Sequence, residues 1–441
     1  MFTLKEINKI CNGKILYNNL KDIDYFSTNS EDVKLNTIFI PLKGKKYDAH
    51  KFIDKAIKNK IVACLVSKKY KNYKKVVKKL IDNNISVIVV KNTYTSLINL
   101  ARYNRYKNFD TFVIAITGSN GKTSTKDLIY DILKNKYNVL KTENNLNNII
   151  GVSKTLLNLN NHDILVIELG MNHKCEISKL SKLVKPNISI ITNIGSAHIG
   201  LLGSIQNIIK AKLEILDGMD NKLLYINSNN KYLNELDENK IDADIIKYNY
   251  NYITYDKKFN YININNNIIK SRKNINPNNI SIAYIIAKKF NIKIKNFQKY
   301  LNYHKPPKMR MEVIKYKDYT VISDCYNSNY ESCINGIDYT INNYKNKKII
   351  LVLGDILELG QYSKYYHELL GNYINKIGTN IHKVYLIGKE VEYTYNIVKY
   401  NKKEIYNNIE EWDNIFNEKN CIYYLKGSRK INLDKLIYKN K

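Results

Sequence analysis

A short glycine-containing segment offers the clearest chemistry in the sequence. Residues 118–123 read GSNGKT and lie between an apolar run, FVIAIT at 112–117, and a helical pattern. Polyphosphate binds where backbone N–H groups can approach it closely, which glycine permits, and where the N-terminus of a following helix adds its dipole. Lys122 can neutralise phosphate charge, and the Thr123 hydroxyl can ligate Mg²⁺. Although Ile116 replaces the first glycine of the full G-x-x-x-x-G-K-[ST] pattern, this strand-to-helix setting predicts a nucleotide-binding loop.

Further polar residues follow other predicted strands. Glu168 ends the run ILVIE, and His198 ends the segment GSAH, which follows the run IITN. Open α/β sheets bind ligands at the carboxyl ends of their strands, and a carboxylate beside ATP phosphate is an ordinary ligand of Mg²⁺. Taken alone, each of the two side chains can serve either as a ligand or as a structural hydrogen-bond partner. Lys212, in the helical stretch KAKLEI, has by itself the features of a solvated surface lysine.

Short apolar runs alternate with helical stretches along most of the chain, which is typical of parallel sheets covered by helices. We expect helices at 51–60 and 279–290, and antiparallel strands within the Tyr/Asn/Ile-rich stretch 248–269. The other expected strands lie at 38–42, 61–66, 86–90, 112–117, 164–168, 188–193, 223–227, 319–323, 348–353, 383–387 and 421–425.

These elements predict an α/β protein of three domains. The central domain, 109–305, has a P-loop-type, mostly parallel sheet flanked by helices, and the segment HKPP marks its end. Before it lies a smaller α/β domain at 1–108, and after it a Rossmann-like domain at 306–441.

The composition excludes several other classes of protein. The 71 Lys and Arg exceed the 40 Asp and Glu to give a net charge of +31, but the excess is mostly Lys spread over the whole chain. It accompanies abundant Asn, Ile and Tyr, which share A/T-rich codons with Lys, so it predicts no nucleic-acid partner. No run of about 18 uncharged apolar residues predicts a membrane span. The six dispersed cysteines form no C-x-x-C pair, which favours free thiols in the cytoplasm over disulfides or zinc.

Several ordered motifs resemble those of the Mur ligases, the ATP-dependent amide-bond-forming enzymes of peptidoglycan synthesis. In the central domain they are TGSNGKTST, TENNLNN at 142–148, IELGMNH at 167–173, GSAHIGLLGS at 195–204 and AKLEI at 211–215. Further motifs resemble the branch of that family that joins D-alanyl-D-alanine to UDP-N-acetylmuramoyl-tripeptide. They are LKGKKYDAHKF at 42–52, MRMEV at 309–313, DCYNSNYES at 324–332, LGDILELG at 353–360 followed by His367, and LKGSR at 425–429.

The resemblance implies a two-step reaction. A substrate carboxylate attacks the γ-phosphate of ATP to give an acyl phosphate, and the dipeptide amine then attacks the acyl carbon through a tetrahedral intermediate. It implies that Thr123 and Glu168 hold one Mg²⁺, and that Glu168 and His198 help to hold a second. Lys212 matches the lysine that this family carbamylates, which would turn a cation into a carboxylate-like metal partner. The implied domain roles are uridine-nucleotide binding, ATP binding, and dipeptide binding with closure, in a monomer.

The resemblance also implies individual site residues. The implied catalytic residues are Lys122, Glu168, His198, Lys212 and Arg310. The implied ATP-binding residues are Gly118, Ser119, Asn120, Gly121, Lys122, Thr123, Ser124, Asn276, Asn279, Arg310 and Asp324. The implied substrate-binding residues are Ser27, Lys43, His50, Asn145, Asn147, Asn148, Tyr326 and Asn329.

Several departures from the family pattern and two alternatives accompany this interpretation. The family's usual Asp-Ser-Arg reads Asn-Ser-Glu at 29–31, and Asn144 replaces a glycine in a loop that requires a left-handed residue. One alternative is a sister amide ligase, including the folylpolyglutamate type. Against the sister ligase that adds the third residue stands the lack of an Asp-Asn-Pro-Arg stretch. The other alternative is a non-catalytic nucleotide- or RNA-binding descendant, which replacement of Lys122, Glu168 or His198 would have favoured.

Overall fold

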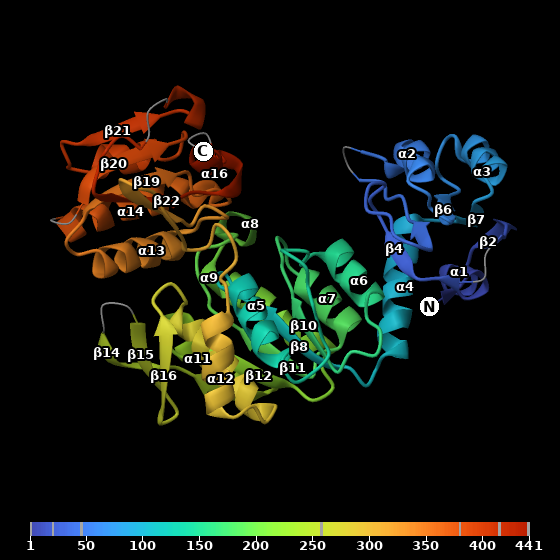
Figure 1. Cartoon of the computed structure of the whole chain (residues 1–441), viewed down its shortest axis with the longest axis horizontal. Coiled ribbons are helices and arrows are strands. Elements are labelled where there is room, and N and C mark those ends of the chain that lie inside the picture. The colour runs from blue at the N-terminus through green and yellow to red at the C-terminus, as the bar shows by residue number, and fades with distance from the viewer. Residues whose placement is uncertain are drawn as a thin grey trace.

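A computed structural model shows a chain of three lobes (Figure 1). The structure describes residues 2–19, 22–44, 47–255, 259–378, 381–412 and 416–438. The N-terminal lobe connects through helix α4 (Thr93–Lys107) to the central lobe, whose last helix, α12 (Ile294–Tyr303), leads into the C-terminal lobe. The prediction of an α/β fold with three domains is confirmed.

The N-terminal lobe is a five-stranded sheet in the order β2-β7-β6-β5-β4, in which only β2 is antiparallel to its neighbour. Side chains alternate between its two faces, as a pleated strand requires. Leu65 of β6 packs in one core cluster with helices α1 and α4, whereas Val66 packs in another with α2 and α3. The strands are β2 (Lys14–Tyr17), β4 (Tyr25–Ser27), β5 (Thr37–Phe39), β6 (Ala63–Ser67) and β7 (Ser86–Val90). The other helices are α1 (Leu4–Cys11), α2 (Ile53–Lys58) and α3 (Tyr73–Asp82).

The central lobe is a six-stranded parallel sheet in the order β13-β12-β11-β8-β10-β9. It places the strand before the GSNGKT segment, β8, between β10 and β11, so the ends of these three strands meet at one edge. The strands are β8 (Phe112–Thr117), β9 (Val139–Lys141), β10 (Ile164–Glu168), β11 (Ile188–Ile191), β12 (Leu223–Asn227) and β13 (Asp244–Tyr248).

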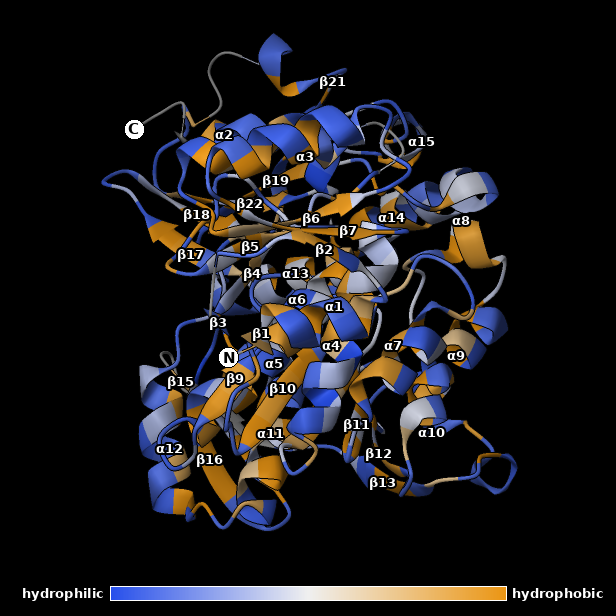
Figure 2. Ribbon diagram, turned by 90° about the vertical axis from the view of Figure 1, so that its right-hand side faces the viewer, coloured by the Kyte–Doolittle hydropathy of each residue, from blue (hydrophilic) through white to orange (hydrophobic). Residues whose placement is uncertain are grey.

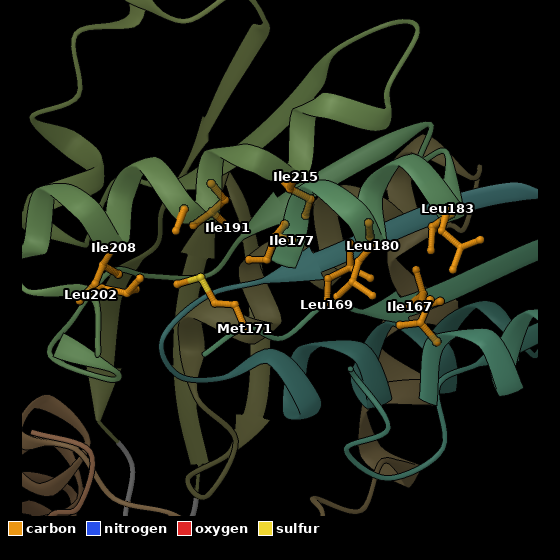
Figure 3. Packing of buried hydrophobic residues seen from close by; sticks show 14 of the residues in the cluster. Ile167, Leu169, Met171, Ile177, Leu180, Leu183, Ile191, Leu202, Ile208 and Ile215 are labelled. Carbon is orange, nitrogen blue, oxygen red and sulfur yellow. The ribbon is translucent and has the colours of Figure 1, made fainter. Parts of the chain in front are cut away.

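Helices cover both faces of the central sheet. Those on one face are α5 (Lys122–Leu133), α11 (Pro277–Lys289) and α12, and those on the other are α6 (Ile149–Leu157), α7 (Glu176–Val184) and α9 (Ile205–Leu213). Figure 3 shows side chains of α7 and α9 packed against those of β10 and β11 on the second of these faces. Burying one Leu or Ile side chain contributes about 1.5–3 kcal/mol, so this layer is a stable platform for the strand ends. A three-stranded antiparallel sheet, β14 (Asn251–Tyr255), β15 (Phe259–Ile264) and β16 (Asn267–Arg272), confirms the antiparallel prediction.

The C-terminal lobe is a six-stranded sheet in the order β17-β18-β22-β19-β20-β21, parallel except for β17. The strands are β17 (Glu312–Lys315), β18 (Tyr319–Ser323), β19 (Lys348–Gly354), β20 (Ile381–Ile387), β21 (Lys403–Tyr406) and β22 (Cys421–Lys426). The helices are α13 (Tyr330–Asn343), α14 (Ser363–Ile377), α15 (Glu392–Ile397) and α16 (Asp434–Tyr438).

The hydropathy of the ribbon agrees with this layering. Figure 2 shows the inner strands predominantly hydrophobic, whereas the helices carry hydrophobic and hydrophilic residues on different sides. Among the described helices, none is long and apolar enough to cross a bilayer. The helix expected at 51–60 is instead a 3₁₀ turn, Ala49–Phe52, followed by α2, and Asp48 caps the turn by accepting from the His50 N–H.

Candidate active site

The GSNGKT loop connects β8 to α5 in a conformation that only glycine tolerates. Gly118 has φ +150°, and a Cβ there would lie 1.9 Å from the Thr192 hydroxyl oxygen. The loop is held from the end of β11, where the Asn193 side-chain oxygen accepts from the Asn120 N–H at 2.7 Å. The Asn193 carbonyl also accepts from the Ser119 N–H at 3.0 Å. The expected strand 188–193 therefore ends at Ile191, because its last two residues support the loop instead.

Lys122 begins α5 and lies directly beside the loop. Its ammonium group donates to the Gly118 carbonyl at 2.7 Å. Burial lowers the pKa of Lys122, and the Glu168 carboxylate partly opposes that effect. The Lys122 charge is thus held next to backbone groups suited to bind phosphate.

Glu168 is 1% exposed at the end of β10 and connects two segments of the site. One carboxylate oxygen accepts from the Thr123 hydroxyl at 2.8 Å, and the other accepts from the Asn147 amide at 2.7 Å. A hydroxyl and a carboxylate in contact are a donor pair that fits Mg²⁺, which keeps several waters and binds phosphate oxygens. Among the described residues, no three or more His, Cys, Asp or Glu side chains gather as a metal cage. Thr123 and Glu168 alone would leave a cation several coordination positions for water, substrate or other groups.

Arg310 reaches this pair from the C-terminal lobe. Its guanidinium donates to the Thr123 hydroxyl at 3.1 Å and lies 4.1 Å from the centre of the Tyr326 ring. Beside it, the amides of Asn120 and Asn329 exchange two hydrogen bonds of 3.0 and 2.8 Å. The structure thus brings Arg310, Tyr326 and Asn329 to the nucleotide-binding loop, although they lie about 200 positions away in the sequence.

The segment 195–200, which carries His198, is also contacted from the C-terminal lobe. Glu331 accepts from both the N–H and the hydroxyl of Ser196, at 2.9 and 2.8 Å. His198 Nδ1 lies 2.8 Å from a carboxylate oxygen of Glu358, and this contact lowers the pKa of Glu358. The Glu358 carbonyl accepts from the Gly200 N–H at 3.1 Å.

Lys212 is buried rather than solvated, with 1% of its surface exposed. Burial lowers the pKa of Lys212 well below its ordinary value, and the nearby Lys122 charge adds to this effect. Within the described part of the chain, its ammonium group has no hydrogen bond or ion pair. An unpaired buried cation is costly, so the site is suited to a neutral amine or to an amine converted into an anion.

The loop 142–148 is fixed by a residue that the sequence reasoning missed. Lys126, buried in α5, donates to the carbonyls of Thr142 and Asn144 at 2.6 and 2.8 Å. Asn144 has φ +47°, as expected for a residue that replaces glycine. Asn148 caps α6 through the Gly151 N–H, whereas Asn145 is exposed. Lys126 lies one helical turn after Lys122 and therefore on the same face of α5. This spacing could have indicated that Lys126 also faces the site.

The residues implied for the nucleoside have structural partners. The Asn279 oxygen accepts from the Thr125 hydroxyl at 3.1 Å, which joins α11 to α5, and Asn276 caps α11. Asp324 forms an ion pair with Lys426 at 2.8 Å within the C-terminal lobe. Ser124 is half-buried at the start of α5.

Of the three residues implied in the N-terminal lobe, Ser27 ends β4, and Lys43 and His50 follow β5. This lobe lies apart from the C-terminal lobe (Figure 1). Ser27 is buried and donates to the Asn29 carbonyl at 2.8 Å, whereas Lys43 is exposed. The His50 ring is buried, with Nδ1 2.6 Å from Asp48.

Both ring nitrogens of His50 are used inside the lobe. Its Nε2 accepts from the Ser67 N–H at 3.1 Å, and the ring stacks on Tyr70. Glu31, which stands where the family has arginine, contacts Lys55. The Lys55 cation therefore lies near the position where an arginine is usual.

Glu331 and Glu358 are site residues that the sequence reasoning did not single out. Both lie within motifs quoted for the resemblance, DCYNSNYES and LGDILELG. No local spacing rule connects either carboxylate to the segment 195–200, because the contacts join residues from two lobes.

Comparisons with known proteins agree with this geometry. Residues 116–300 match the family model described as Mur ligase middle domain, and residues 309–419 match the one described as Mur ligase, glutamate ligase domain. A relative from Buchnera aphidicola subsp. Baizongia pistaciae is 33% identical over 98% of this chain and 97% of its own length. That relative is named UDP-N-acetylmuramoyl-tripeptide–D-alanyl-D-alanine ligase.

Solved structures show the same fold. A crystal structure of MurF from Acinetobacter baumannii superposes with a TM-score of 0.85 at 24% identity, covering 99% of this chain and 98% of the other. MurF ligase from Thermotoga maritima, solved in complex with ADP, gives a TM-score of 0.77 at 24% identity. It covers 95% of this chain and 98% of that structure.

Proposed function

The chain belongs to the Mur ligase family, and we infer that it is the ATP-dependent ligase that joins D-alanyl-D-alanine to UDP-N-acetylmuramoyl-tripeptide. This reaction forms a carbon–nitrogen bond in the synthesis of peptidoglycan precursors. The observation that carries the inference is the Thr123 hydroxyl, which Glu168 contacts from the central lobe and Arg310 from the C-terminal lobe. A phosphate held at the GSNGKT loop would therefore meet groups from both lobes at once.

We propose a division of labour among the three domains. Residues 1–108 bind the uridine nucleotide, residues 109–305 bind ATP, and residues 306–441 bind the dipeptide and close over the site. The boundaries are supported by the ends of elements, since α4 ends at Lys107 and α12 at Tyr303. Because ATP and nucleotide-linked precursors are cytoplasmic compounds, we propose that the chain works in the cytoplasm. By resemblance to the family, we also propose that it works as a monomer.

The first chemical step joins two anions. The tripeptide carboxylate attacks the γ-phosphorus of ATP, the bond to the β,γ-bridging oxygen breaks, and ADP leaves. Lys122 and Arg310 are positioned to offset the repulsion between carboxylate and phosphate, an electrostatic role of large effect in a buried site. Thr123, Glu168 and His198 would hold Mg²⁺, which supplies further charge neutralisation when bound.

The second step forms the amide. The dipeptide amine attacks the acyl carbon, negative charge develops on the acyl oxygen, and phosphate leaves as the amine loses its proton. We propose that Tyr326 and Asn329 lie beside the incoming dipeptide, because both come from the C-terminal lobe and meet the loop at Asn120. Asn145, Asn147 and Asn148 would contact the peptidyl substrate, with Asn147 held by Glu168.

Lys212 is proposed to act as a carbamate. Its nitrogen attacks the carbon of CO₂ and loses a proton, which replaces a cation by an anion. Burial favours the neutral amine that this reaction needs, and the new anion would lie near the Lys122 cation instead of repelling it. The carbamate would then serve as a partner for Mg²⁺.

A phosphate-release assay with different amines tests the function. With UDP-N-acetylmuramoyl-tripeptide, ATP and Mg²⁺ present, we expect release only when D-alanyl-D-alanine is added. Release with another amino acid but not with the dipeptide would indicate a sister ligase. No release with any amine would indicate a nucleotide-binding protein without this activity.

A further inference from the structure

Two glutamates of the C-terminal lobe contact the short segment that carries His198, but in different ways. Glu331 binds the backbone and hydroxyl of Ser196. Glu358 contacts the imidazole itself, with 2.8 Å between its carboxylate oxygen and His198 Nδ1. Only the second contact can control how the ring is oriented.

The backbones of the two partners are held in an unusual conformation. His198 has φ +65° and Glu358 has φ +68°, in a region that residues other than glycine seldom occupy. The two segments also approach closely, since a Cβ on Gly200 would lie 2.5 Å from the Gly360 nitrogen. Such conformations persist only where surrounding contacts fix them, and they concentrate at functional sites.

The contact contributes little as a surface ion pair. The Glu358 side chain is 47% exposed, and exposed ion pairs are typically worth about 0–1 kcal/mol. The contact affects the ring more than it affects stability, because a carboxylate oxygen 2.8 Å from Nδ1 limits how far the imidazole can turn. Nδ1 is buried and the contact is an ion-pair approach rather than an aligned hydrogen bond. Carboxylates beside the second ring nitrogen commonly orient histidines that ligate metals. With the carboxylate beside Nδ1, Nε2 is the nitrogen available to a cation.

We propose that Glu358 is a positioning residue that prepares His198 for metal binding when the C-terminal lobe contacts the central lobe. This rests on the proposed function, in which His198 helps to hold Mg²⁺. Since Glu358 and His198 belong to different lobes, metal affinity and the contact between lobes become coupled. Such coupling is reciprocal, so bound metal favours the closed arrangement by the same factor.

Titration of the full-length chain with Mn²⁺ tests the proposal. A non-hydrolysable ATP analogue is present, and free Mn²⁺ is measured by electron paramagnetic resonance. We expect Glu358→Ala to weaken Mn²⁺ binding about tenfold or more, while affinity for the analogue alone is unchanged. Glu358→Gln keeps an oxygen acceptor and should bind Mn²⁺ nearly as the natural chain does. Glu358→Ser, which also ends short of the ring, repeats the test with a second side chain.

Two comparisons separate orientation of His198 from general damage. Glu390→Ala removes a carboxylate that stays within the C-terminal lobe, where it accepts from Ser363, and should leave Mn²⁺ binding unchanged. In a His198→Ala background, Glu358→Ala should cause no further loss. Equal loss in both backgrounds, or unchanged Mn²⁺ binding in Glu358→Ala, would overturn the proposal. If His198→Ala alone binds Mn²⁺ as the natural chain does, the metal role of His198 fails instead, which is a distinguishable result.

Discussion

The two junctions between lobes are built in contrasting ways. At the N-terminal junction, Asn104 and Arg105 of α4 are buried and bind backbone carbonyls of the central lobe. The Asn104 amide donates to the Leu156 and Leu159 carbonyls at 2.7 and 2.9 Å, and Arg105 Nε donates to the Val184 carbonyl at 2.8 Å. These partner carbonyls have no part in the proposed chemistry, so the buried contacts of this junction have a structural role.

The C-terminal junction consists instead of polar contacts at the site. Arg310 binds Thr123, Asn329 binds Asn120, and Glu358 contacts His198. Each of these central-lobe residues is also proposed to bind nucleotide or metal, so ligands would compete with or complete the same contacts. The N-terminal junction therefore fixes how its two lobes are arranged, whereas the contacts of the C-terminal junction can change with the bound ligand.

The largest expected effect concerns Lys212, which is buried in the central lobe near Lys122 of the nucleotide-binding loop. We expect Lys212→Ala to lower the rate of D-alanyl-D-alanine-dependent phosphate release by about a hundredfold or more, since buried charges at such sites have effects of this size. Added acetate should restore part of the rate, because it can supply the missing carboxylate. Lys210→Ala, at an exposed position of the same helix, is the matched control. Unchanged activity in Lys212→Ala would remove the carbamate from the mechanism.

Arg310→Ala tests whether the C-terminal junction serves chemistry rather than folding. We expect turnover to fall about a hundredfold, because a cation facing phosphate is lost. The thermal unfolding midpoint should change little, since Arg310 is only partly buried. Arg102→Ala, on the exposed side of α4, should alter neither quantity. Full activity in Arg310→Ala would contradict the account of this junction.

Arg105→Met tests the opposite junction. Removing the guanidinium leaves the Val184 carbonyl without its partner, which should lower the free energy of unfolding by about 1–3 kcal/mol. Chemical denaturation measures this change, and activity per folded molecule should stay close to that of the natural chain. A large loss of activity with unchanged stability would reverse the roles assigned to the two junctions.

Lys126→Met affects the loop 142–148, which takes no part in the junction contacts named above. We expect a raised KM for the peptidyl substrate and an unchanged KM for ATP, because Lys126 holds the carbonyls of Thr142 and Asn144 rather than the nucleotide loop. Steady-state kinetics with each substrate varied in turn would measure the difference. A raised KM for ATP alone would count against this role.

The smallest expected effect concerns the contact between Asp131 and His304, whose contribution to stability depends on pH. Asp131 of α5 lies 2.8 Å from His304 Nδ1, where the linker begins. Burial raises the pKa of Asp131, but hydrogen bonds from His304 and Lys134 outweigh it and hold the pKa below its ordinary value. A depressed folded pKa stabilises the fold above the unfolded value of about 3.9, and this contribution is lost as pH falls through the folded value. Asp131→Asn should therefore lower the free energy of unfolding at pH 7. At pH 3 its free energy of unfolding should lie closer to that of the natural chain. Denaturant titration at both pH values measures these differences.

The sequence was informative wherever function depends on local pattern. Strand β8, the GSNGKT loop and helix α5 follow from a continuous apolar run, the glycine spacing and a helical pattern, and Glu168 from its place at a strand end. Lys212 was different, because its local pattern indicated a solvated helix lysine and only the family resemblance pointed to a role in the site.

What could not be predicted depends on contacts between distant segments. Arg105 reads as one more basic residue of a helix until its partner carbonyls, about 80 positions away, are known. The same holds for Glu331 and Glu358. The short edge strands β9, β13 and β21 were missed because each is paired on one side only and carries a weak apolar pattern.

The mass of the nucleotide-linked product tests whether this chain joins D-alanyl-D-alanine to the tripeptide. The full-length chain would be incubated with UDP-N-acetylmuramoyl-tripeptide, ATP, Mg²⁺ and D-alanyl-D-alanine, and the products separated and weighed by mass spectrometry. We expect a new species heavier than the tripeptide substrate by one dipeptide less one water, formed together with ADP and phosphate. An unchanged tripeptide mass, in a chain shown to be folded and able to bind ATP, would contradict it.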